Sequence, residues 1–207
     1  MNTEYSGNIY SIKLNFDLGY VYAELLDYSD VQEFDGILVQ IYSYNVINQP
    51  KNIDDIEVIK SKGILFGPVP INKYPNIKGK YAWKYIGKTN NYSKESLWFK
   101  NLRGLINEDD NWNNLKPWFK SKAFSNDSDY IECDYKEVRR LETLILNHSE
   151  MVKIKVTMLY LITKGENVED FYDLNKIGNR NMYLQLINTY FDVTKTEKLL
   201  KFLKSLE

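Results

Sequence analysis

The sequence predicts an α+β protein, with a small antiparallel β-sheet or barrel at the N-terminus followed by a C-terminal helical subdomain. Two observations carry this prediction. Apolar residues recur at every second position through most of the N-terminal half, which is typical of strands, whereas after residue 133 they recur at helical spacing. We therefore expect a β-rich domain over 1–100, a connector over 101–133 and a helical domain over 134–207.

Five short strands are expected in the N-terminal domain. They cover residues 9–14, 20–26, 37–42, 64–66 and 81–86. The fourth is expected to end at Gly67–Pro70, because glycine and proline are typical of turns. Strand alternation places Val21, Ala23 and Leu25 on one face of the second strand. The residues between them are partly polar, so we expect the other face of the sheet to be exposed to water.

Two segments differ from this pattern. Residues 52–62 carry isoleucines at helical spacing and predict one short helix. Residues 101–133 are rich in Asn, Asp and Ser, yet they contain large aromatic side chains, which disordered chains usually lack. We interpret 101–133 as a connector that packs onto a domain.

Five helices are predicted in the C-terminal part. Three start signals with N-terminal capping residues stand at Asp134–Glu137, Asn167–Asp170 and Thr194–Glu197. Gly165 and Gly178 are expected to mark helix ends. The stretch Met151–Ile162 is apolar on most faces, which places it at the centre of the helical part.

Composition excludes several classes of protein. Cys133 is the single cysteine and cannot form an internal disulfide, and one Cys with one His cannot build a zinc module. The N-terminus lacks a basic and apolar leader, and the longest mainly apolar stretch, Val156–Ile162, is too short to cross a bilayer. We expect a soluble, cytoplasmic protein that binds no metal, no cofactor and no membrane.

Signals for catalysis are weak. A Ser-His-Asp or Cys-His arrangement would have to use His148, the single histidine, which we place near the C-terminus of a helix, where it would cap the last carbonyl groups. Residues 82–89 fit a loose phosphate-binding loop, but their strand-like alternation and the missing apolar helix favour a strand followed by a turn. We predict that the protein is not an enzyme.

Charge is separated along the N-terminal half although the net charge of the chain is only −1. Residues 1–57 carry two lysines against ten acids, a balance of −8, and residues 58–100 carry nine lysines against one acid, a balance of +8. The acidic runs are flanked by polar residues and look solvated. They form either an ordinary wet surface or a protein-binding patch, since acid-base catalysis needs buried carboxylates with separated pKa values.

The strand segments resemble the family of immunity protein 26. The resemblance lies in residues 7–14, 19–26, 37–42, 64–69 and 83–88, and spans about residues 7–100. Proteins of this family are encoded in bacterial polymorphic-toxin loci and are thought to neutralise a cognate toxin in the cytosol. The resemblance therefore implies a non-enzymatic immunity protein whose partner is a protein toxin, for example a nuclease with a basic cleft.

An acidic, aromatic surface can fill a basic cleft, because opposite charge speeds the encounter and buried aromatic side chains hold the complex. We therefore expect toxin inhibition by occlusion. The candidate contact residues are Asp27, Asp30, Glu33, Asp35, Tyr42, Tyr44, Asp54 and Asp55.

The alternative is a nucleic-acid-binding small barrel that uses the segment 73–88. Lysines alternate there with aromatic residues, and small barrels bind single strands through aromatic side chains in basic grooves. The residues concerned are Lys73, Lys78, Lys80, Lys84 and Lys88 with Tyr74, Tyr81, Trp83 and Tyr85. The balanced overall charge argues against this alternative.

Overall fold

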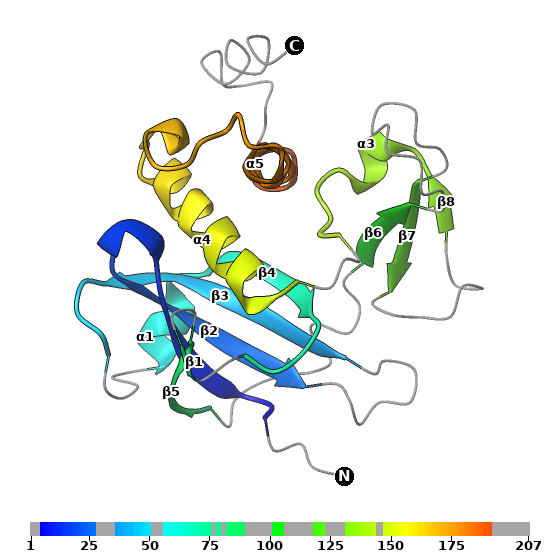
Figure 1. Cartoon of the computed structure of the whole chain (residues 1–207). Helices are drawn as coiled ribbons and strands as arrows, with labels where there is room; N and C mark the ends of the chain where they lie inside the picture. The colour runs from blue at the N-terminus through cyan, green and yellow to red at the C-terminus, as the bar shows by residue number, and fades with distance from the viewer. Residues whose placement is uncertain are drawn as a thin grey trace.

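The computed structural model has an α+β fold, as the sequence predicts (Figure 1). It describes residues 5–27, 36–50, 56–75, 78–79, 82–89, 101–105, 118–122, 131–143 and 147–191. None of the helices in these residues is both long enough and apolar enough to span a membrane.

The N-terminal part forms one open sheet of five antiparallel strands in the order β4-β3-β2-β1-β5. The strands are β1 (Asn8–Lys13), β2 (Tyr20–Asp27), β3 (Ile37–Val46), β4 (Ile64–Ile71) and β5 (Lys84–Lys88). All five predicted strands are present, so the prediction of an antiparallel sheet is confirmed. The segment that fits a loose phosphate-binding loop contains β5, as the strand interpretation requires.

Both faces of this sheet are buried, and the prediction of a wet face is wrong. Val21, Ala23 and Leu25 share one face, as expected, and belong to the main core with helix α4 (Ser149–Thr163), which lies over the sheet in Figure 1. The opposite face forms a second cluster in which Ile59 of helix α1 (Ile56–Ser61) packs against strand residues. The short helix predicted within 52–62 thus exists, and it covers the face that we expected to be wet.

Strand β4 continues five residues past Phe66, where the sequence predicts a turn. Gly67 has a φ of +92°, and a Cβ atom there would lie 2.5 Å from the carbonyl oxygen of Val39, so only glycine fits. The pairing of β3 with β4 shifts register between Val39 and Ile41, beside this glycine. Pro68 is tolerated because β4 is an edge strand and can lack one ladder N–H group.

The predicted connector also contains strands. Strands β6 (Asn101–Leu105), β7 (Trp118–Lys122) and β8 (Ile131–Cys133) form a second antiparallel sheet in the order β6-β7-β8. Trp118 and Phe119, two of the aromatic residues that indicated packing, are buried. Long polar insertions between the strands hid their alternation in the sequence.

Arg103 joins this second sheet to the helices. Its side chain is 4% exposed and donates to the Arg139 carbonyl oxygen at 2.7 Å and to Thr189 Oγ1 at 3.1 Å. The guanidinium group also lies 5.8 Å from the ring centres of both Trp118 and Tyr135. A forked, planar cation is needed to make these contacts together.

Three α-helices of the C-terminal part lie within the described residues: α3 (Tyr135–Val138), α4 and α5 (Ile177–Tyr190). The capping box predicted at Asp134–Glu137 is present, but α3 is only one turn long. After it the chain turns, and the Glu142 carbonyl accepts a hydrogen bond from the Arg103 N–H at 2.8 Å. The helix predicted to start at 194 lies outside the described residues.

Helix α4 confirms the prediction of a central, largely buried helix, and Gly165 follows its C-terminus with a φ of +75°. Two other predictions are wrong. The start signal at Asn167–Asp170 gives only a short 3-10 turn, η3 (Val168–Asp170). Gly178 lies in the first turn of α5 rather than at a helix end, because the preceding helix had already ended at Thr163.

Candidate functional site

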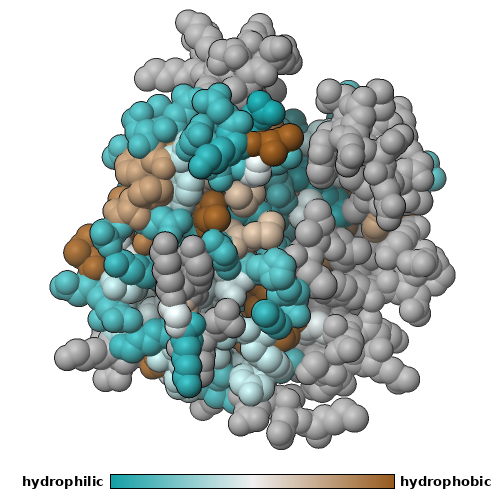
Figure 2. Space-filling view, viewed as in Figure 1, coloured by the Kyte–Doolittle hydropathy of each residue, from teal (hydrophilic) through white to brown (hydrophobic). Residues whose placement is uncertain are grey.

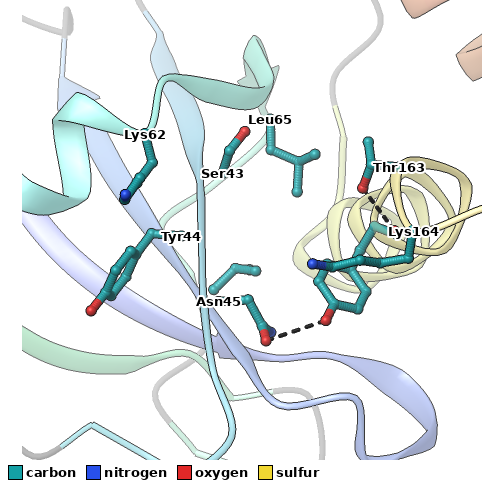
Figure 3. Close-up of a pocket in the computed structure, with 9 residues that line it drawn as sticks. Ser43, Tyr44, Asn45, Lys62, Leu65, Thr163 and Lys164 are labelled. Carbon is teal, nitrogen blue, oxygen red and sulfur yellow. Dashed lines mark hydrogen bonds between the residues drawn. The ribbon is translucent and has the colours of Figure 1, made fainter.

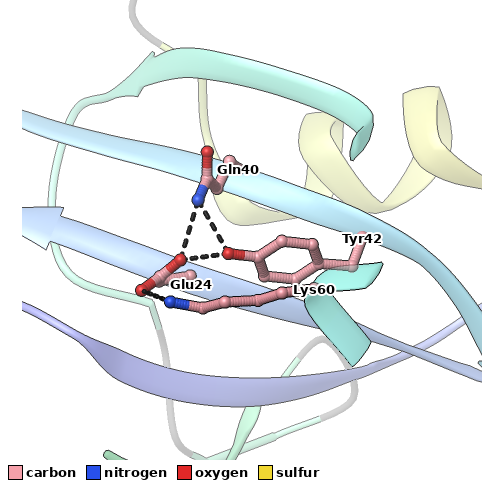
Figure 4. A network of polar contacts seen from close by, with 4 residues as sticks. All are labelled: Glu24, Gln40, Tyr42 and Lys60. Carbon is pink, nitrogen blue, oxygen red and sulfur yellow. Dashed lines mark hydrogen bonds and ion pairs between the residues drawn. The ribbon is translucent and has the colours of Figure 1, made fainter. Parts of the chain in front are cut away.

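A buried polar network holds α1 against the sheet (Figure 4). Glu24 of β2 is 1% exposed, and its Oε2 accepts hydrogen bonds from Gln40 Nε2 at 2.7 Å and from the Tyr42 hydroxyl. Its Oε1 pairs with Lys60 Nζ of α1 at 3.3 Å. Gln40 Nε2 also donates to the Tyr42 hydroxyl oxygen at 2.8 Å. Both carboxylate oxygens are therefore engaged by groups from two strands and one helix.

The electrostatics of this network follow from burial. Desolvation, followed by the hydrogen bond to the Glu24 carboxylate, raises the pKa of Tyr42 far above its ordinary value. The phenol therefore stays protonated and donates to the carboxylate. The ion pair between the partly exposed Lys60 and the buried Glu24, with these extra hydrogen bonds, fixes the position of α1 on the sheet.

Apolar contacts add to this attachment. Ile59 of α1 is 1% exposed and packs in one cluster with Ile9, Tyr22, Tyr42 and Ile86. Lys60, the next residue, reaches Glu24. A helix of only six residues is marginal alone, so its packing and the ion pair must hold it in place.

Two of the predicted contact residues are interior residues, which corrects the sequence prediction for them. Asp27 is 1% exposed and accepts a hydrogen bond from the Tyr74 hydroxyl at 2.5 Å. It follows Val21, Ala23 and Leu25 at strand spacing and so points to the core face, as the alternation could have indicated. Tyr42 is 3% exposed, because α1 covers the face that it occupies.

Tyr44 is half-buried, with its ring 5.5 Å from that of Tyr22. It keeps an accessible edge beside the network and remains a candidate contact residue. The other five predicted contact residues lie outside the described residues: Asp30, Glu33, Asp35, Asp54 and Asp55.

The described residues nevertheless fix where the acidic segments leave the scaffold. Asp30, Glu33 and Asp35 lie in the connection between Asp27 and Ile37, which pair as neighbours in the sheet. Asp27 is three residues along β2 from Glu24, or about 10 Å at a rise of about 3.3 Å per residue. Asp54 and Asp55 directly precede α1, the helix that Glu24 binds through Lys60. Glu24 thus anchors α1, whose first residue packs against the same apolar cluster as Tyr44 and Val46, toward the end of β3 away from Ile37.

A cleft of about 330 Å³ opens at the other end of β3 (Figure 3). It lies between the sheet and the C-terminal turn of α4. Its lining residues are Val21, Ser43, Tyr44, Asn45, Lys62, Leu65, Tyr160, Thr163 and Lys164. This cleft could not be predicted from the sequence, since its lining residues come from four elements that only the fold brings together.

The residues of the nucleic-acid alternative do not form a set of exposed platforms. Trp83 is 1% exposed, and the Tyr74 hydroxyl is engaged by Asp27. Lys84 donates to the Pro50 carbonyl oxygen at 3.1 Å, whereas Tyr85 is 50% exposed. Lys80 and Tyr81 lie outside the described residues.

The two candidate nucleophile and base residues have ordinary surroundings. His148 is the N-cap of α4, which corrects the prediction of a helix C-terminus, and its Nδ1 lies 2.8 Å from Asn72 Nδ2. Cys133 is a free, half-buried thiol in β8, and burial raises its pKa. Within the described part of the chain, no group of three or more His, Cys, Asp or Glu side chains is placed to hold a metal ion.

The described surface in Figure 2 is mainly hydrophilic, and its apolar residues stand in separate spots. Ile177, 67% exposed, is one of the exposed apolar side chains of the described residues. Scattered exposed apolar residues of this kind are normal on a protein surface. Polar and charged contacts therefore dominate what this face offers to a partner.

No protein-family model, curated protein sequence or solved structure matches the chain. The resemblance to the immunity protein 26 family therefore stays a prediction from the sequence.

Proposed function

We propose that this protein is a non-enzymatic immunity protein that binds and occludes a cognate bacterial toxin in the cytosol. The observation that carries the proposal is the anchoring of α1 by Glu24. This ion pair fixes on the sheet the helix that follows Asp54 and Asp55, and Asp27 and Ile37 flank the connection that carries Asp30, Glu33 and Asp35. The two acidic segments leave the scaffold at different places, one before the start of α1 and the other at the end of the sheet where Asp27 pairs with Ile37.

The proposed surface works through charge and pre-organisation. The carboxylates of the two acidic segments create a negative potential that attracts a basic partner and raises the association rate. A scaffold whose buried ion pair and apolar cluster are already formed loses less conformational entropy on binding than a flexible one. Tyr44 adds an aromatic side chain beside the network, and aromatic residues are common anchors at interfaces.

The contact set is accordingly narrower than the sequence prediction. Asp27 and Tyr42 support the surface from inside, and six residues are proposed to face the toxin: Asp30, Glu33, Asp35, Tyr44, Asp54 and Asp55. Reversal of the acidic charges should therefore abolish neutralisation without unfolding the protein.

The test is growth protection against toxin domains encoded in the same genome as this protein. Wild-type protein should restore growth of cells that express the toxin domain, and the triple variant D30K/E33K/D35K should fail to do so. A matched control, E132K/E150K/E166K, reverses three exposed acids on other elements and should still protect. Equal protection by both variants would contradict the proposed acidic contact surface. A wild-type protein that does not protect cells would contradict the proposed immunity function.

A further inference from the structure

The cleft at the end of β3 has the features of a ligand site. Its volume of about 330 Å³ lies at the lower end of the range of about 300–1,000 Å³ typical of small-molecule sites. Val21 and Leu65 supply apolar lining, and Tyr44 and Tyr160 add aromatic rings. An apolar wall with a few polar groups is the usual composition of such a site.

An irregularity in the sheet opens the cleft. Val21 pairs with Asn45, but Ala23 pairs with Ile41, so β3 bulges between these two positions. The β3–β4 pairing also shifts beside Ile41. Bulges redirect side chains and interrupt strand pairing, and this one brings Ser43 and Asn45 into the cleft lining.

Asn45 is locked by its neighbours and forms a rigid wall. Its Nδ2 donates to the carbonyl oxygens of Leu18 and Tyr20, both at 3.2 Å, and its Oδ1 accepts from the Tyr160 hydroxyl at 3.3 Å. Figure 3 shows this last bond joining β3 to the helix across the cleft. The polar atoms of Asn45 are thus satisfied within the protein, and the donors left for a ligand are on other residues.

Those donors are cationic. Lys62 and Lys164 line the cleft from either side of β3, together with Ser43 (Figure 3), and the lining residues that the structure describes include no carboxylate. In the part of the chain that the structure describes, neither ammonium group forms an ion pair, and the Ser43 side chain forms no hydrogen bond. Lys164 Nζ lies 5.5 Å from the centre of the Tyr160 ring, which keeps it along the cleft wall.

The C-terminus of α4 does not oppose an anion here. The carbonyl oxygens of Tyr160, Leu161 and Ile162 accept hydrogen bonds from the N–H groups of Lys164, Gly165 and Glu166. This capping covers the negative end of the helix dipole, and the charge of Lys164 offsets it further.

We infer that the cleft between β3 and the C-terminus of α4 binds an oxyanion, a phosphate or a carboxylate, that carries a small apolar or aromatic body. Lys62, Lys164 and the Ser43 hydroxyl bind the anionic group, and the tyrosine rings with Leu65 contact the body of the ligand. This site shares Tyr44 with the proposed toxin surface but binds its ligand through lysines rather than carboxylates.

Three probes of similar shape test the inference on the full chain: phenyl phosphate, benzoate and neutral benzyl alcohol. The two anions should bind saturably, with amide shifts at Ser43, Asn45, Gly63 and Thr163, and benzyl alcohol should bind much more weakly. The tighter of the two anions identifies the phosphate or the carboxylate as the preferred group.

The variant K62Q/K164Q should bind both anions about tenfold more weakly, because it removes two charge-assisted contacts. The matched variant K73Q/K136Q changes two exposed lysines outside the cleft and should bind like the wild type. Shifts that grow linearly with concentration, equal binding by the two variants, or equal binding of benzyl alcohol would overturn the inference.

Discussion

Removal of one hydroxyl group, in Tyr42→Phe, should weaken the attachment of α1. The change deletes the hydrogen bond from the phenol to the Glu24 carboxylate and the bond from Gln40 to the phenol oxygen. Hydrogen bonds to a charged group contribute about 1.5–3 kcal/mol and neutral ones about 0.5–1.5 kcal/mol. Glu24 keeps Gln40 and Lys60, so we expect a loss of about 2–3 kcal/mol in the free energy of unfolding.

Urea unfolding at neutral pH, followed by circular dichroism, measures this loss, and the melting temperature should fall by about 4–12 °C for a chain of this size. Tyr85→Phe is the matched control, because Tyr85 is 50% exposed in the same sheet and should change stability by less than about 0.5 kcal/mol. A loss below about 0.5 kcal/mol in Tyr42→Phe as well would refute the role of the network.

Three further outcomes are expected. Burial raises the folded-state pKa of Tyr42 and of Tyr190 above 10. The stability that these two phenols contribute is therefore complete below pH 10 and declines as the pH rises beyond it. Urea unfolding measured at increasing alkaline pH should show this decline, and the decline should be shallower in Tyr42→Phe. Arg103→Lys should lower the free energy of unfolding by about 1.5–3 kcal/mol and speed amide hydrogen exchange in β6, because lysine cannot form the two hydrogen bonds of the guanidinium group together. Unchanged exchange in β6 would contradict this role of Arg103. Leu159→Ala, which truncates a buried side chain of α4, should lower the free energy of unfolding by about 2–5 kcal/mol. Ile177→Ala should leave it almost unchanged, because Ile177 is 67% exposed. Equal losses in the two variants would contradict the assigned core.

The core face of the main sheet was predictable because strand alternation determines which side chains share a face. Val21, Ala23 and Leu25 lie on that face as expected. The buried state of the opposite face was not predictable, because it depends on α1, a six-residue helix whose position is set by Lys60 and Glu24. Alternation shows which residues point the same way, but not what packs on them.

Local signals were reliable where the interaction is local. The capping box at Asp134–Glu137 is present, since it needs only residues three apart. The length of α3 depends instead on Arg103, more than thirty positions earlier, which binds the chain just after the helix. Strands β6 to β8 were missed for the same reason, because long insertions separate the residues that pair.

For the proposed contact surface, the sequence predicted only that acidic residues are concentrated in residues 1–57. The acidic balance of residues 1–57 pointed to a surface, yet it could not separate interior acids such as Glu24 and Asp27 from those in the connections. Lys62 and Lys164 could not be predicted as part of one site, because they are about a hundred positions apart and come to line the same cleft only through the fold. Register and tertiary packing decide which charges become available.

The association rate of the purified protein with a toxin domain against which it protects cells would test the proposed function most directly. Stopped-flow mixing at several salt concentrations should show a rate constant that falls steeply with ionic strength. D30K/E33K/D35K should associate at least about tenfold more slowly than wild type, and E132K/E150K/E166K should match wild type at the same salt. A rate that is independent of salt and equal in all three proteins would contradict the account.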